Sequence, residues 1–259
     1  MNRLEGWRGG ELDVDELTHQ TINDYLRWAR EQNYSDDTRR NRRRMFLTLA
    51  NAAADDGLVA PIRVSKVMRV TLPERTPLAY TVEQAKKLLL ACEAFDGHHS
   101  ATGVRRRDFW RSYILAAWDT GLRGCDLRRL RVDHVLGAPE ARIVHVQQKT
   151  RKRVAITFRP ETIKAINRTL PPDRALCWPL WGRLELFRRE ARRLVKIAGL
   201  PGSLKCLRSG SGTAVEKVAP GRGHDHLGNT RRVFERNYLD ETQIDADRPL
   251  PPPIDTDEI

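Results

Sequence analysis

Three short segments of the chain contain residue types that are suited to chemistry at phosphorus. They read Thr-Gly-Leu-Arg-Gly-Cys-Asp-Leu at 120–127, Leu-Lys-Cys-Leu-Arg at 204–208 and Leu-Gly-Asn-Thr-Arg-Arg-Val-Phe-Glu-Arg-Asn-Tyr at 227–238. A guanidinium stays charged at any working pH and offers a rigid fork of donors that matches phosphate oxygens. A tyrosine hydroxyl can attack phosphorus and hold the product as a covalent ester.

In this order, and on a basic chain, the three segments resemble the catalytic boxes of the tyrosine recombinases, the phage-integrase family of DNA strand-exchange enzymes. The resemblance implies that Tyr238 is the nucleophile and forms a 3′-phosphotyrosyl bond. It implies that Arg123 and Arg208 stabilise the pentavalent transition state. It also implies a general acid on a hairpin turn, Lys149, with Lys152 close enough to be confused with it.

Two positions depart from the family pattern. Lys205 replaces the histidine of the His-x-x-Arg box, a substitution that the family tolerates, and Asn229 replaces the histidine of the Leu-Gly-His box. Lysine can still donate to a phosphate oxygen but is a poorer base near neutral pH, and asparagine cannot shuttle a proton. We therefore expect both to be auxiliary phosphate ligands. Tyr238 lies nine residues beyond Asn229, the interval of the family, so His224 and His226 are not moved into this position.

The composition favours a nucleic-acid partner. The 259 residues carry a net charge of +12, and the pI is about 10.0. Such an excess of basic residues attracts polyanions, although a solubility surface or a ribosome-associated protein would also explain it. The four cysteines are widely spaced, so neither a zinc site nor a disulfide framework is expected. Neither a signal peptide nor a membrane span is found. We expect a cytoplasmic, nucleoid-associated protein that binds double-stranded DNA without a cofactor or metal.

Periodicity and capping residues predict most of the elements, including an N-cap at Ser35 and a capping box at Thr81-Val82-Glu83-Gln84. Helices are expected over 14–32, 35–57, 81–94, 108–120, 160–169, 181–198, 207–218 and 229–239. Two alternating, β-branched runs at 143–148 and 153–158, joined by Lys-Thr-Arg-Lys, predict a hairpin. The expected fold is mainly α with a small antiparallel β-sheet, as an integrase-type catalytic domain preceded by a short helical DNA-binding domain.

The resemblance covers roughly 14–240 and is strongest over 78–240, and it suggests four parts. These are a partial helical core-binding domain at 1–60, a basic linker at 61–77, the catalytic domain at 78–240 and an acidic, Pro-rich tail at 241–259. The expected DNA-binding residues are Arg39, Arg40, Arg43, Lys66 and Arg69. The family's core-binding domain has about four helices, and about two are found here. Either the chain is a short natural variant or its start lies too far downstream.

Three functions fit these features. The first is a site-specific recombinase that cuts and rejoins DNA as a tetramer on two duplexes, for integration or excision. The second is a non-catalytic DNA-binding relative, which Asn229 and the short N-terminal domain favour. Retention of the tyrosine, the two arginines and the lysine argues against it. The third is a type IB topoisomerase-like enzyme, which would relax supercoils without the sequence preference of a recombinase.

Overall fold

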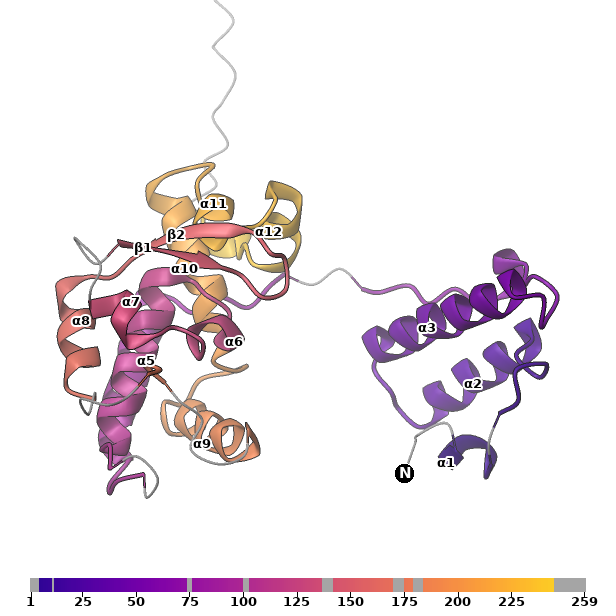
Figure 1. Cartoon of the computed structure of the whole chain (residues 1–259), viewed down its shortest axis with the longest axis horizontal. Coiled ribbons are helices and arrows are strands. Elements are labelled where there is room, and N and C mark those ends of the chain that lie inside the picture. The colour runs from indigo at the N-terminus through magenta and orange to yellow at the C-terminus, as the bar shows by residue number, and fades with distance from the viewer. Residues whose placement is uncertain are drawn as a thin grey trace, which may run out of the picture. The chain divides into compact units, whose positions relative to one another are not determined.

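The computed structural model describes residues 5–10, 12–73, 76–99, 103–136, 142–169, 175–178 and 184–244. The chain divides into two compact units, an N-terminal unit of residues 1–75 and a C-terminal unit of residues 76–259 (Figure 1). No helix in these described ranges is both long and apolar enough to cross a membrane.

The N-terminal unit is built on two antiparallel-packed elements, α2 (His19–Glu31) and α3 (Asp36–Asp55), preceded by the single turn α1 (Glu5–Arg8). The predicted N-cap of α3 is confirmed, because Ser35 Oγ accepts from the Thr38 amide at 3.3 Å. The rings of Tyr25 and Phe46 meet edge to face at 5.0 Å in the core between the two helices. Met45 and Leu49 of α3 are exposed at 37% and 52%.

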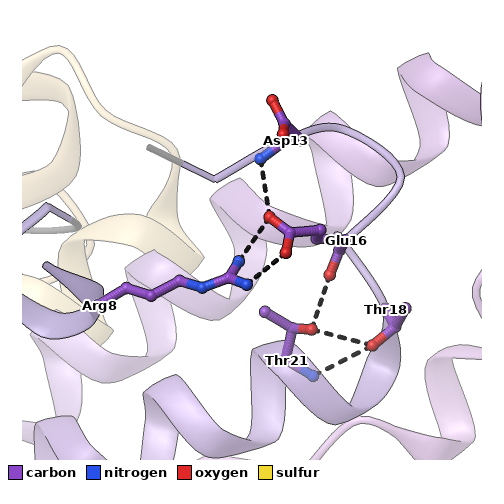
Figure 2. Close-up of polar contacts among 5 residues, drawn as sticks. All are labelled: Arg8, Asp13, Glu16, Thr18 and Thr21. Atoms are coloured by element: carbon purple, nitrogen blue, oxygen red, sulfur yellow. Dashed lines mark hydrogen bonds and ion pairs between the residues drawn. The ribbon is translucent and has the colours of Figure 1, made fainter. Parts of the chain in front are cut away.

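The residues before α2 form a hydrogen-bonded turn instead of the first helical turn that the sequence predicts (Figure 2). The Glu16 carboxylate accepts from the Arg8 guanidinium and from the Asp13 amide at 3.1 Å. The Thr21 hydroxyl donates to the Glu16 carbonyl at 2.6 Å, and Thr18 Oγ1 accepts from the Thr21 amide at 3.2 Å. Thr18 is thus the N-cap, and the helix begins at residue 19 rather than at residue 14.

Much of the segment expected as a linker is attached to the N-terminal unit. It contains a 3-10 turn at Val64–Lys66, and Val67 is 3% exposed in the α2–α3 core. The Asn23 side chain donates to the Lys66 carbonyl at 3.0 Å and accepts from the Met68 amide at 2.7 Å. The boundary between the units accordingly falls between residues 75 and 76.

The C-terminal unit is organised around α5 (Arg106–Thr120), which is apolar on several faces. It packs against α4 (Val82–Ala91), α8 (Pro160–Asn167) and α10 (Lys205–Val218). The predicted capping box of α4 is confirmed, with Thr81 and Gln84 exchanging hydrogen bonds at 3.0 and 3.2 Å. Trp110 of α5 is fully buried and contacts Phe187 of α9 (Leu184–Ile197) with ring centroids 5.0 Å apart.

The predicted hairpin is confirmed as an antiparallel pair, β1 (Arg142–Val146) and β2 (Arg153–Thr157), with Ile143 opposite Ile156. Both isoleucines face the core and are buried. The turn is closed by the backbone of Gln147. Its N–H donates to the Lys152 carbonyl at 2.9 Å, and its backbone carbonyl accepts from the Arg151 N–H at 2.9 Å. The regular structure in the rest of the described residues is helical. The predicted fold class, mainly α with a small antiparallel sheet, is therefore confirmed.

Several short elements are not predicted by the sequence. They are α6 (Gly124–Leu127), α7 (Val132–Leu136) and α11 (Gly223–Leu227), each about one helical turn. A single turn contains too few apolar positions to give a periodic signal. The last helix, α12 (Arg231–Asn237), lies within the range predicted for it. Most of the expected tail, residues 245–259, lies outside the described residues.

α11 is fixed to α10 and α5 through the half-buried imidazole of His226. Ser211 Oγ donates to the Trp118 carbonyl at 2.5 Å and lies 2.7 Å from His226 Nε2, so the imidazole donates to the hydroxyl through that nitrogen. Burial lowers the pKa of His226 to about 4, and the nearby Arg208 charge acts in the same direction. The folded protein therefore holds this histidine neutral.

This imidazole should make stability depend on pH. The unfolded chain binds a proton at His226 near its ordinary pKa of 6.5, but the folded chain does so only near pH 4. Stability from the neutral imidazole is present above pH 6.5 and is lost as the pH falls through 4. We expect the free energy of unfolding to fall by on the order of 3 kcal/mol across this interval, and His226→Gln to flatten the dependence. Urea titrations at a series of pH values measure it.

His224→Gln, on the same helix, is the matched control for loss of an imidazole. If His226→Gln kept the wild-type slope while retaining a cooperative unfolding transition, the assignment of the pH dependence to this residue would be wrong.

Candidate functional site

Arg123 is positioned by the end of α5. The cap residue Gly121 has φ +56°, in the left-handed region that favours glycine. A Cβ there would lie 2.5 Å from the Leu227 side chain, so glycine also allows the close approach of α11. Arg123 follows as the N-cap of α6. Its guanidinium donates to Gln147 Oε1 at 2.7 Å and to Asn229 Oδ1 at 3.2 Å.

Arg208 is buried within α10, with 5% of its surface exposed. Its guanidinium donates to the Gly121 carbonyl, to the Leu227 carbonyl at 2.9 Å and to Asn229 Oδ1 at 3.4 Å. Burial lowers the pKa of Arg208, and the charge of Arg123 acts in the same direction. An arginine nevertheless stays protonated in a protein, so two positive charges share this site.

The acceptors that hold the two guanidiniums are neutral oxygens of Gln147, Asn229, Gly121 and Leu227. Within the described residues neither guanidinium pairs with a carboxylate, whereas Arg159 does so with Asp119 at 2.6 Å. The positive charge at the site is therefore oriented without being neutralised, as anion binding requires. Asn229 Nδ2 is buried and has no hydrogen-bond partner in the described part of the chain, so an unsatisfied donor lies beside the two guanidiniums.

Tyr238 is the C-cap of α12, where its amide donates to the Phe234 carbonyl at 2.9 Å. Arg208 Cζ lies 4.8 Å from the centre of the tyrosine ring. Burial acts to raise the pKa of Tyr238, but the positive charges of Arg208 and Arg123 outweigh it, and the net shift is downward. The ring hydroxyl is thus easier to ionise than that of an ordinary tyrosine, which favours a nucleophilic role.

A cleft of about 1650 Å³ in the C-terminal unit contains the six predicted catalytic positions. Its lining includes Arg123, Lys149, Lys205, Arg208, Asn229 and Tyr238. Lys149 and Lys152 are both exposed on the hairpin turn and both line the cleft, so the geometry does not choose between them. Lys205 is exposed in the first turn of α10, which begins two residues earlier than the sequence predicts.

The structure places Asn229, rather than His224 or His226, in contact with the two arginines. Asn229 Oδ1 meets both guanidiniums, whereas His226 Nε2 meets Ser211. His224 Nε2 lies 3.4 Å from Asp225 Oδ1. No group of three or more His, Cys, Asp or Glu residues among those described is arranged to hold a metal ion.

Sequence reasoning missed Gln147, which is 1% exposed and contacts Arg123. Strand alternation was the available signal, because Ile143, His145 and Gln147 share one face, and a glutamine at an inward position needs polar partners. Asp126 is fully buried and accepts from the Gln148 amide at 2.8 Å, so it anchors the hairpin.

The expected DNA-binding residues lie in the N-terminal unit in two different states. Arg40, Lys66 and Arg69 are exposed. Arg39 pairs with Asp36, and Arg43 donates to the Met68 carbonyl at 2.8 Å and the Val67 carbonyl at 3.3 Å. Arg39 and Arg43 therefore have intramolecular roles. The side chains of Arg40, Lys66 and Arg69 are exposed and can contact an external anion.

Solved structures with a similar fold exist, although no family model and no curated protein sequence matches the chain. The structure of a lambda integrase(75-356) dimer bound to a COC′ core site aligns with a TM-score of 0.70 at 17% identity, covering 97% of this chain and 89% of that one. The XerH site-specific recombinase, bound to a palindromic difH substrate in a post-cleavage complex, aligns with a TM-score of 0.68 at 17% identity, covering 90% and 72%. The Tn1549 transposon integrase in complex with a circular intermediate DNA aligns with a TM-score of 0.64 at 16% identity, covering 89% and 83%.

These neighbours are tyrosine recombinases, so the resemblance drawn from the three sequence segments is confirmed at the level of the fold. The chain has the fold that these recombinases share, including the integrase-type arrangement of helices with a small antiparallel sheet.

Proposed function

We propose that the protein is a site-specific DNA recombinase that cleaves and rejoins strands through a 3′-phosphotyrosyl intermediate on Tyr238. The observation that carries the proposal is the pair of guanidiniums, the buried Arg208 and the half-buried Arg123, held by neutral oxygens beside a tyrosine whose pKa is lowered. Such a site suits a reaction that builds negative charge on a phosphate. The fold shared with lambda integrase and XerH supports the same reading.

In the proposed cleavage step, Tyr238 Oη attacks the scissile phosphorus and loses its proton to water. The new O–P bond forms as the bond from phosphorus to the 5′-oxygen breaks, so the energy of the phosphodiester is kept for rejoining. Arg123 and Arg208 donate to the non-bridging oxygens, with Lys205 and the free Nδ2 of Asn229 as auxiliary donors. Lys149 gives a proton to the leaving 5′-oxygen.

The proposed partner is double-stranded DNA, bound by both units. The exposed residues Arg40, Lys66 and Arg69 would contact phosphates in the N-terminal unit, which makes affinity fall with salt. Crystals of lambda integrase contain a dimer bound to a core site and a tetramer bound to a Holliday junction. We accordingly propose a tetramer on two duplexes as the active assembly, acting in integration or excision.

The central prediction concerns Tyr238→Phe. This variant should bind DNA nearly as wild type does and form no covalent adduct, because only the attacking hydroxyl is removed. The measurement incubates the purified chain with fragments of its own genome, including DNA that flanks its gene, denatures the mixture and detects protein that migrates with DNA. Sequencing the trapped fragments gives the site.

Tyr113→Phe is the matched control, because Tyr113 lines the same cleft but burial raises its pKa to about 12. It should keep adduct formation, and adducts in Tyr238→Phe would exclude this tyrosine as the nucleophile. Salt-sensitive binding without adducts in wild type would indicate a non-catalytic DNA-binding relative. Relaxation of supercoils without sequence preference would indicate a topoisomerase-like enzyme.

The two turn lysines should differ in effect. We expect Lys149→Ala to slow single-turnover cleavage of the trapped site by on the order of a hundredfold or more, and Lys152→Ala to slow it far less. A duplex whose scissile 5′-bridging oxygen is replaced by sulfur tests the role, because a thiolate needs no proton to leave. The sulfur duplex should restore cleavage by Lys149→Ala. A larger defect in Lys152→Ala, or no rescue by sulfur, would reassign the general acid.

A further inference from the structure

The Gln147 side chain joins three segments of the cleft. Its Oε1 accepts from Arg123 at 2.7 Å and from the Thr150 hydroxyl at 2.9 Å, and its Nε2 donates to the Leu227 carbonyl at 2.9 Å. The residue is 1% exposed, so each of these polar atoms depends on its protein partner. One neutral amide thereby links the arginine at the start of α6, the hairpin turn and the end of α11.

The contacts of Gln147 complete a closed ring of hydrogen bonds that includes both guanidiniums. The Leu227 carbonyl that accepts from Gln147 also accepts from Arg208 at 2.9 Å. Asn229 Oδ1 closes the ring on the other side, at 3.2 Å from Arg123 and 3.4 Å from Arg208. The relative position of the two arginines is thus set by two amide side chains and one carbonyl.

The same residue also closes the turn that presents the lysines. Its backbone amide donates to the Lys152 carbonyl, and its carbonyl accepts from Arg151, which has φ +56°. Thr150, which follows Lys149 directly, is tied to the side chain of Gln147. A substitution of Gln147 should therefore alter the positions of both the hairpin turn and the Arg123 guanidinium.

The neutral charge of Gln147 matters as much as its shape. A carboxylate in its place could still accept from Arg123 and Thr150, but it would lose the donor to Leu227 and would neutralise the guanidinium. The Arg123 guanidinium would then pair with this carboxylate and would be less available to a phosphate. Gly228, with φ +63°, leaves room for the amide, because a Cβ there would lie 2.8 Å from Gln147 Nε2.

We propose that Gln147 is a positioning residue that couples the lysine-bearing turn to Arg123, so that the general acid and the phosphate-binding guanidinium are held in one geometry. The inference rests on the proposed function and extends it to a residue that does not itself touch the DNA. It predicts a loss in the rate of the chemical step at saturating protein, and no comparable loss in DNA affinity.

The test measures single-turnover adduct formation on the DNA site trapped by wild type, at saturating protein, together with DNA affinity. Gln147→Met keeps the approximate shape and removes the amide, and we expect a 10- to 100-fold lower rate, about the effect of misplacing a reacting group. With the sulfur-containing duplex the loss should shrink, since the Lys149 contribution is no longer needed, and the remainder reports on Arg123. Gln147→Glu should also be slow, and sulfur should not restore it.

Gln148→Met is the matched control, since Gln148 is exposed on the same turn. Thermal unfolding of each variant identifies one that does not fold, and the isosteric Gln147→Glu then carries the test. Wild-type rates in both Gln147 variants, or a defect that lies in affinity alone, or an equal defect in Gln148→Met, would each overturn the inference. Absence of adducts with the wild-type protein would instead overturn the proposed function, and the inference with it.

Discussion

Two like charges side by side in a mostly buried site are the constraint on which the rest of the C-terminal unit depends. Burial lowers the pKa of Arg208, and repulsion from the nearby Arg123 charge acts in the same direction, so holding the two charges together is unfavourable. Carboxylate partners would relieve this strain but would also cancel the charge. The structure instead supplies neutral oxygens from Gln147, Asn229 and two backbone carbonyls. The site keeps its attraction for an anion because no carboxylate among the described residues pairs directly with either guanidinium.

The need for neutral acceptors explains why four segments converge on the two arginines: the end of α5, the end of α11, the hairpin and the segment that contains Asn229. Backbone carbonyls can face a guanidinium only where the helical pattern is interrupted, and here the interruptions are the ends of α5 and α11. Gly121 and Gly228 provide the left-handed residues at those two ends, and both positions lack room for a Cβ. The hairpin brings the third acceptor, Gln147, and Asp126 anchors it through the Gln148 amide.

The sequence predicts the long elements, the charged residues and Asn229, but not the side chain of Gln147 or the backbone carbonyls that accept from the two guanidiniums. Amphipathic helices, the capping box at Thr81 and the β-branched hairpin leave local signals, and the structure agrees with them. The start of α2 was misplaced because Glu16 and Thr18 form a side-chain turn that periodicity does not detect. The role of the Leu227 carbonyl could not be predicted, because a backbone group has no residue identity and its partners lie 19 and 80 residues away.

The replacement of both expected histidines changes where pH can act. The oxygens of Gln147, Asn229, Gly121 and Leu227 that accept hydrogen bonds from the two guanidiniums belong to groups that do not ionise. The imidazole of His226 is bonded to Ser211 and stays neutral down to a pKa of about 4. The charge of the arginine cluster is therefore constant across the neutral range. Under the proposed function, the pH dependence of cleavage must come from Tyr238, whose pKa the same cluster lowers, and from the lysine that protonates the leaving group. In the proposed mechanism, Asn229 thus separates phosphate binding from proton transfer, two roles that a histidine would combine.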